Sequence, residues 1–172
     1  MATSGTTTFN LNIDEIIDEG FERCGMSTAS GYDLRSARRS LDLLFAEWGN
    51  RGIHLWKVAL HENALVSGQA EYSVSAGVSD VLEAFVSSTA AASDSSSTQD
   101  VSLTKIDRST YAALPNKLAT GQPSQYYVSR ETTPKIYLYQ APDLNTYTTL
   151  KYYVIKRIED AGAYTNDADV AY

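Results

Sequence analysis

The organisation of this chain turns on residues 33–56, which read DLRSARRSLDLLFAEWGNRGIHLW. Apolar residues recur in its first part at alternating steps of three and four, a spacing that forms one continuous stripe on an α-helix. The stripe residues are Leu34, Ala37, Leu41, Leu44 and Trp48. Residues 49–52 include two glycines and an asparagine, which tolerate the left-handed backbone found at helix ends. The sequence therefore predicts a long amphipathic helix that ends there and leads directly into a β-region from Ile53.

An earlier helix is predicted from residue 12 onward. Asn12 is followed three positions later by Glu15, as in a capping box, and Gly25 is a typical helix end. One face of this helix is apolar, with Ile13, Ile16, Ile17, Phe21 and Cys24. Cys24 is expected to be buried and unreactive, because a reactive thiolate needs electropositive surroundings and this helix is acidic. The two helices predict a helical hairpin over residues 10–52, preceded by a flexible arm at residues 1–9.

The polar faces of the two predicted helices carry opposite charges. The first helix places carboxylates opposite its apolar face, among them Asp14, Asp18 and Glu22. The polar side of the second helix carries Arg35, Arg38 and Arg39. A charged helix face is usually only solvated, but two complementary faces favour an ion-pairing role.

Residues 53–158 are predicted to form a β-rich part. Strands are expected at 53–61, 70–74, 78–86 and 101–106, and a final meander at 126–130, 135–140 and 146–157. The first strand is apolar on both faces, so it is expected to be covered on both sides. Residues 87–100 predict a mobile loop, because without large apolar side chains they cannot offset the entropy of ordering. Asp107 is expected to cap a short helical turn, and residues 159–172 are interpreted as a C-terminal extension.

The composition limits the class of protein. With 21 Asp and Glu against 14 Lys and Arg, the 172-residue chain has a formal net charge of −7. That balance argues against tight binding of nucleic acid, which needs a basic surface to displace counterions. Cys24 is the only cysteine, so no intrachain disulfide can form and a reducing compartment is expected. With neither a signal peptide nor a run of about 18 apolar residues, the sequence predicts a soluble protein made in a cytoplasm.

No motif in the sequence indicates catalysis or metal binding. His54 and His61, the only histidines, are seven positions apart and fall on opposite faces of the predicted strand, where they cannot share a metal ion. The segment 167–169 resembles the start of a calcium loop but lacks the glycine and the later glutamate of that motif. The sequence therefore predicts no catalytic residue, no cofactor and no metal site.

The 12 tyrosines are the unusual feature of the composition. Several of them lie in the predicted meander, including Tyr126, Tyr127, Tyr137 and Tyr139. Ordinary packing within a sheet is one interpretation, since aromatic side chains suit cross-strand pairs. A protein–protein surface, where Tyr is enriched, and a platform for glycans are two others.

Six stretches, in chain order, carry a resemblance to a known family. They are WGNRGIHLW (48–56), LVSGQAEYSV (65–74), DVLEA (80–84), IDRSTYAALPNK (106–117), GQPSQYYV (121–128) and RIEDAGAYTNDADV (157–170). Together they cover nearly the whole chain and resemble the head-to-tail adaptor proteins of short-tailed phages, also called tail tubular protein A. The resemblance implies an α+β fold, with an N-terminal helical hairpin or bundle and an antiparallel β-barrel or β-sandwich insertion. Members of the family usually continue into a further apolar helix beyond the position of Tyr172.

The resemblance also implies a structural virion protein without enzyme activity, assembled in the host cytoplasm and located in the phage tail or neck. Such subunits form a closed ring, dodecameric by family resemblance, that joins the portal protein to the tail nozzle protein. DNA passes through the lumen without specific binding, and no membrane is involved. A tail-associated carbohydrate-binding β-module that uses the tyrosines is the alternative function. An enzyme is a weaker third, because hydrolysis would need a pair of carboxylates and none stands out.

Two sets of residues are candidates for contacts in such a ring. Closed rings require two different patches of one subunit to meet head to tail. We expect the acidic face of one subunit to meet the basic face of the next, through Asp14, Asp18, Glu22, Arg35, Arg38 and Arg39. We expect the tail-facing or mating surface to include Tyr126, Tyr127, Tyr137 and Tyr139.

Overall fold

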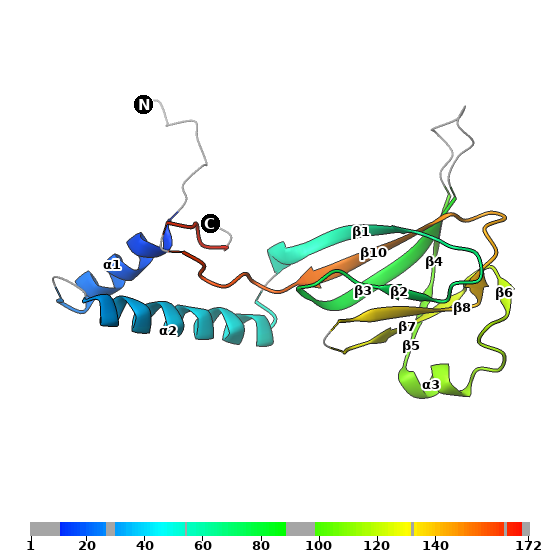
Figure 1. Ribbon diagram of the computed structural model, residues 1–172, viewed down its shortest axis with the longest axis horizontal. Helices are drawn as coiled ribbons and strands as arrows, with labels where there is room; N and C mark the ends of the chain where they lie inside the picture. Colours follow the sequence, from blue (N-terminus) through cyan, green and yellow to red (C-terminus); the bar gives the residue numbers. More distant parts are fainter. Residues whose placement is uncertain are drawn as a thin grey trace, which may run out of the picture. The chain divides into compact units, whose positions relative to one another are not determined.

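The computed structural model describes residues 11–26, 30–53, 55–88, 99–131, 133–163 and 165–169, and the fold is mixed α+β (Figure 1). The chain divides into two compact units. The helical unit combines residues 1–56 with residues 158–172, and the β unit spans residues 57–157. The β unit is therefore inserted into a discontinuous helical unit, and the segment expected to be a C-terminal extension belongs to the helices.

Both helices of the helical unit begin with a capping box. Helix α1 spans Ile13–Arg23, and the Glu15 carboxylate accepts a hydrogen bond from the Asn12 N–H at 3.2 Å. Helix α2 spans Gly31–Asn50, and Asp33 accepts from the N–H of its N-cap, Ser30. Helix α2 ends within the predicted stretch, where Gly52 adopts a φ of 77°. The predicted capping box starts α1, whereas the Ser30 cap of α2 was not predicted from the sequence.

The core of the helical unit joins three chain segments. It contains Ile13 and Ile17 of α1, Phe45 of α2, and Ile158, Ala161 and Ala168 of the C-terminal segment. The Asp42 carboxylate accepts a hydrogen bond from the Ala161 N–H at 2.7 Å, which ties the C-terminal segment to α2. Most of the predicted α2 stripe is half-buried against this core, but Leu44 is exposed.

The β unit contains two four-stranded sheets, and no sheet of the described residues closes into a barrel. The first sheet is antiparallel, in the order β1 (Val58–Ala64), β10 (Thr149–Lys156), β3 (Val78–Ser87), β4 (Asp100–Ser102). The second has the order β2 (Glu71–Ser73), β8 (Lys135–Tyr139), β7 (Gln125–Ser129), β5 (Thr104–Ile106), and β5 runs parallel to β7. The remaining elements are a 3₁₀ turn at Leu55–Lys57, helix α3 at Arg108–Ala113, and a parallel pair of β6 (Thr120–Gly121) and β9 (Ala141–Pro142).

One apolar core lies between the two sheets. The first sheet contributes Val81, Leu150 and Val154, and the second contributes Ile136 and Leu138. The immediate neighbours of these residues along each strand point outward, as the period of two in a strand requires. Figure 1 shows the two sheets of the β unit one above the other, with α3 beside β5 and β7.

The first predicted strand differs from the observed one. Strand β1 begins only at Val58, after the 3₁₀ turn, and Val58 and Leu60 are 42% and 44% exposed. The prediction that this strand is covered on both sides is therefore wrong. An antiparallel sheet can leave one face in solvent, and here that face keeps apolar residues.

Two further strand predictions are corrected by the sheet order. Strands β7 and β8 pair as the meander predicted, but β10 lies in the other sheet, between β1 and β3. The predicted strand at 101–106 divides at the buried Leu103 into β4 and β5, which belong to different sheets. The predicted loop at 87–100 starts too early, because Ser87 is a buried residue of β3. It also ends too late, because Asp100 is the first residue of β4. Residues 89–98 lie outside the described residues.

Candidate functional site

The residues that could carry catalysis have ordinary surroundings. His61 on β1 is half-buried, and its Nδ1 lies 3.0 Å from the Ser75 hydroxyl. Burial and the nearby Lys156 lower the pKa of His61, which favours a neutral ring. His54 lies outside the described residues. Within the described residues, His, Cys, Asp and Glu nowhere gather in a group of three that could hold a metal ion.

Cys24 corrects a prediction, because its side chain is exposed. Burial fades along the apolar face of α1: Ile13 and Ile17 are buried, Phe21 is half-buried, and Cys24 follows the last helical residue. Packing of α1 on the core weakens toward its end, where Phe21 is the last residue that contacts it, so a face drawn from helical spacing alone extends too far.

Three tyrosines stack on the outer face of the second sheet, and we call Tyr111, Tyr127 and Tyr137 the tyrosine cluster. Tyr127 and Tyr137 are direct neighbours across β7 and β8, with ring centroids 5.9 Å apart. Tyr111, from α3, lies 5.5 Å from the Tyr127 ring and 5.8 Å from the Tyr137 ring. The Nζ of Lys117 lies 5.6 Å from the Tyr111 ring centroid. The cluster thus holds α3 against the sheet and leaves its edges half-exposed.

Tyr126 does not belong to this surface, contrary to the prediction. It is 1% exposed, and its hydroxyl donates a hydrogen bond to the Leu82 carbonyl at 3.2 Å. Burial, with smaller contributions from Asp80 and Glu83, raises the pKa of Tyr126 to about 12. Consecutive strand residues point to opposite faces, so Tyr126 and Tyr127 cannot share one surface. Tyr139 lies on the outer face with Tyr127 and Tyr137 and is half-buried.

Two open hollows adjoin the tyrosine cluster and share Tyr127 and Arg130. One, of about 430 Å³, is lined by Arg108, Tyr111, Tyr127, Ser129, Arg130, Glu131 and Tyr137. The other, of about 520 Å³, is lined by Lys105, Ile106, Asp107, Tyr127, Val128 and Arg130. Most of their charges are engaged: Arg130 pairs with Asp80 at 2.8 Å, and Glu131 accepts from the Ser129 hydroxyl at 2.7 Å.

Tyr111 and Arg108 also belong to this site, although their sequence patterns did not indicate it. The predicted cap at Asp107 did indicate the short helix that carries both residues. In the structure, the Asp107 carboxylate accepts a hydrogen bond from the Thr110 N–H at 2.8 Å and thereby starts α3. Helix α3 starts two residues after the end of β5 and has only six residues, so Arg108 and Tyr111 lie close to the end of that strand. Nothing in the local sequence, however, predicts that β5 lies beside β7.

The charged helix faces keep most of their charges unpaired within the subunit. In the described part of the chain, Asp14, Asp18, Glu22, Arg35 and Arg39 form no ion pair. The ion pairs on these helices are instead Arg23 with Glu19 and Arg51 with Glu47, each within one helix. The structure therefore brings the acidic and basic helices into one unit without pairing the two patches.

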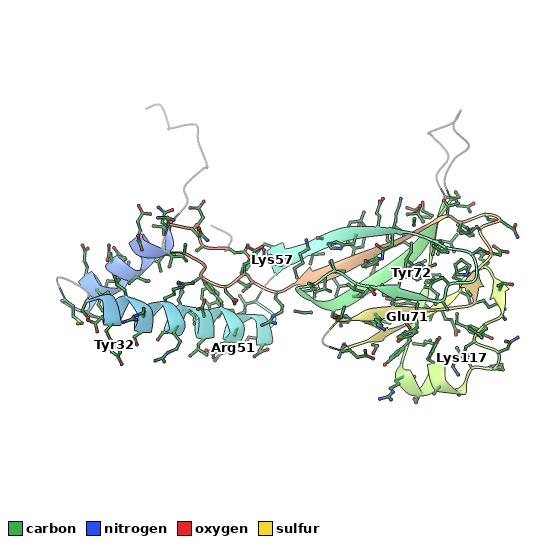
Figure 2. All side chains as sticks on the ribbon, in the orientation of Figure 1. Tyr32, Arg51, Lys57, Glu71, Tyr72 and Lys117 are labelled. Carbon is green, nitrogen blue, oxygen red and sulfur yellow. The ribbon has the colours of Figure 1, made fainter. Side chains whose placement is uncertain are left out.

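One line of exposed residues follows the length of α2. Tyr32, Arg39, Leu43 and Asn50 recur at steps of seven, four and seven, which is five helical turns in total. Tyr32 and Leu43 are 73% and 65% exposed, and Figure 2 shows Tyr32 near the start of the helix. Tyr32, Arg35, Ser36 and Arg39 line a shallow hollow of about 250 Å³.

No protein-family model matches the chain, and no curated protein matches it. Among the described residues, no helix is both long enough and apolar enough to cross a membrane.

Proposed function

We propose that this chain is the head-to-tail adaptor subunit of a short-tailed phage, a ring-forming virion protein that joins the portal to the tail nozzle. The observation that carries the proposal is the insertion of a two-sheet β unit into a discontinuous helical unit. The resemblance of the sequence to adaptor proteins implies an arrangement of this kind. We identify the β unit with the β-sandwich insertion of that family.

The helix faces support a subunit contact in a closed ring. Exposed ion pairs stabilise a contact by only about 0.2–1 kcal/mol each, so their role would be register and orientation. Asp14, Asp18 and Glu22 of one subunit would meet Arg35, Arg38 and Arg39 of its neighbour. Among the described residues, Asp18, Glu22 and Arg39 form no ion pair within the subunit. Their charges are therefore available for a contact with a neighbouring subunit.

The outer face of the second sheet is the proposed mating surface. Tyr and Arg are enriched in protein–protein interfaces, because both give a large contact area together with hydrogen bonds. Tyr127, Tyr137 and Tyr139 lie there with Tyr111 and Arg108. Either the portal or the nozzle protein would dock on this surface.

The net charge supports a channel that does not hold DNA. Each subunit carries a formal net charge of −7, and a dodecameric ring multiplies that excess. A wall of this sign would let DNA pass without the phosphate contacts that slow its exit. The protein would act in the virion and would require no cofactor, metal or membrane.

A carbohydrate-binding β-module is the second candidate. The hollow of about 430 Å³ beside the tyrosine cluster favours it, because aromatic rings and Arg108 could hold a sugar. The three rings stack on one another, however, which occupies ring faces that a sugar would need.

The proposal is tested by binding to the portal protein of the same particle. Co-sedimentation of the two purified proteins should give a stable complex, and reversing Arg38 and Arg39 to Glu should weaken it while the circular dichroism stays unchanged. Reversing the exposed Arg157 to Glu, outside both helix faces, gives a control with a charge change of the same sign. A wild-type chain that does not bind the portal protein but binds glycans on an array would overturn the adaptor proposal in favour of the second candidate.

A further inference from the structure

The outer face of the first sheet presents an apolar patch that the subunit leaves open to solvent. Leu60 of β1 lies directly opposite Tyr153 of β10, and Val58, two residues earlier, lies on the same face of β1. These three side chains and Leu82 of β3 are each between 38% and 44% exposed. We call Val58, Leu60, Leu82 and Tyr153, together with Glu83, the sheet patch.

A bulge in β3 places the acidic residue of the sheet patch. The register between β10 and β3 shifts so that Tyr153 faces Glu83 while Val154 faces Val81. The extra residue turns both Leu82 and Glu83 to the outer face. Glu83 forms no ion pair among the described residues, so its charge stands unpaired beside the Tyr153 ring.

The line of exposed residues on α2 has the complementary composition. We call Tyr32, Arg39 and Leu43 the helix stripe. Arg39 stands between two exposed apolar residues, just as Glu83 stands among apolar residues of the sheet patch. Arg39 is likewise without an ion pair in the described part of the chain.

We propose that the helix stripe of one copy packs on the sheet patch of the next copy, with Arg39 against Glu83 at its centre. The inference rests on the proposed ring and names the surfaces that supply the apolar part of its subunit contact. It reassigns Arg39 to Glu83, while Arg35 and Arg38 keep the acidic face of α1 as their proposed partner. The acidic face of α1 cannot supply that part, because its exposed residues include no large apolar side chain. A stable interface needs an apolar centre, for which ion pairs at its rim do not substitute. Two different patches of one chain also meet the head-to-tail requirement of a closed ring.

The test is sedimentation equilibrium of the full chain over a wide range of concentrations. The wild type should self-associate, and Arg39→Glu or Glu83→Arg alone should weaken association by about tenfold or more, because attraction becomes repulsion between like charges. An equimolar mixture of the two single variants should recover association, since each contact in an alternating ring then joins opposite charges. Leu60→Ser should weaken association, whereas Leu118→Ser, at a residue 80% exposed elsewhere in the β unit, should not. Because misfolded chains could not recover association on mixing, such recovery would also show that both variants are folded.

Three results would overturn the inference. A wild-type chain that stays monomeric at every concentration would show that the helix stripe and the sheet patch do not bind each other. Single charge reversals that leave association unchanged show that other surfaces carry it. Rescue of Arg39→Glu by Asp18→Arg, and not by Glu83→Arg, assigns Arg39 to the acidic face of α1 instead. Co-sedimentation with portal judges the adaptor proposal separately, because the chain can bind portal whichever surfaces join its copies.

Discussion

Removing the Asp42 carboxylate should destabilise the helical unit selectively. The carboxylate accepts a 2.7 Å hydrogen bond from the N–H of Ala161, which is buried. Hydrogen bonds to charged groups stabilise folded proteins by about 1.5–3 kcal/mol, and a buried N–H left without a partner costs a similar amount. We therefore expect Asp42→Ala to lower the free energy of unfolding of this unit by about 2 kcal/mol. Asp42→Asn, which keeps an acceptor oxygen, should cost less.

Urea unfolding followed by tryptophan fluorescence isolates this effect. Both tryptophans, Trp48 and Trp56, belong to the helical unit, whereas the β unit contains none. Selective excitation of tryptophan thus reports the helical unit even if the two units unfold separately. Asp18→Ala is the matched control, because Asp18 is exposed and forms no ion pair in the described part of the subunit, and it should stay within about 0.5 kcal/mol. A loss below that value for Asp42→Ala would refute the view that the C-terminal segment is tied to α2.

Three other predictions concern the β unit and the charge of the chain. Tyr126→Phe should lower the free energy of unfolding of the β unit by about 1 kcal/mol by removing the hydroxyl that donates to the Leu82 carbonyl, whereas Tyr139→Phe should have little effect, both measured by urea unfolding followed by far-ultraviolet circular dichroism. The hydrogen bond from Lys135 lowers the pKa of Glu71, so its stabilisation is full above the unfolded value of 4.5 and is lost as the pH falls through the folded pKa. Glu71→Gln should therefore flatten the fall in thermal midpoint below about pH 4.5, and an unchanged pH profile would contradict this cause. Duplex DNA should not bind measurably near physiological salt, and micromolar affinity that weakens steeply with salt would reveal a basic lining.

Local signals predicted the helices well. Capping residues and glycines at helix ends act within one turn, so the start of α1 at Asn12 and the end of α2 near Gly52 follow from short stretches of sequence. The start of α2 at Ser30 was not predicted. The same reasoning extended the buried face of α1 too far, because helical spacing cannot show where the partner surface ends. It also missed Phe45, which is buried although it lies beside the predicted α2 stripe.

The order of the strands could not be predicted in the same way. The alternation in β10 is that of any strand with one buried face, and it does not say which neighbours pair with it. The buried Leu103 resembles the middle of one strand in the sequence, yet its N–H bonds the Ala84 carbonyl at the point where the chain crosses between sheets. Long-range pairing of this kind also places Tyr111 over the β7 and β8 strands, which is why the tyrosine cluster emerged only from the structure.

The exposed apolar residues of β1 show the same limit. An apolar strand residue in the sequence indicates that its side chain is buried. It does not indicate whether a second sheet or another subunit covers that side chain. Val58 and Leu60 are uncovered within the subunit, so the sequence pattern is consistent with a cover that the single chain does not supply.

The most direct test of the adaptor proposal is the native mass and electron-microscopy image of the purified protein with and without portal. The subunit mass is 18.8 kDa. The proposal predicts, on portal, a closed ring whose mass is an integral multiple of that value, with an open axial channel. A species of 18.8 kDa that neither closes into a ring nor adds mass to portal would contradict it.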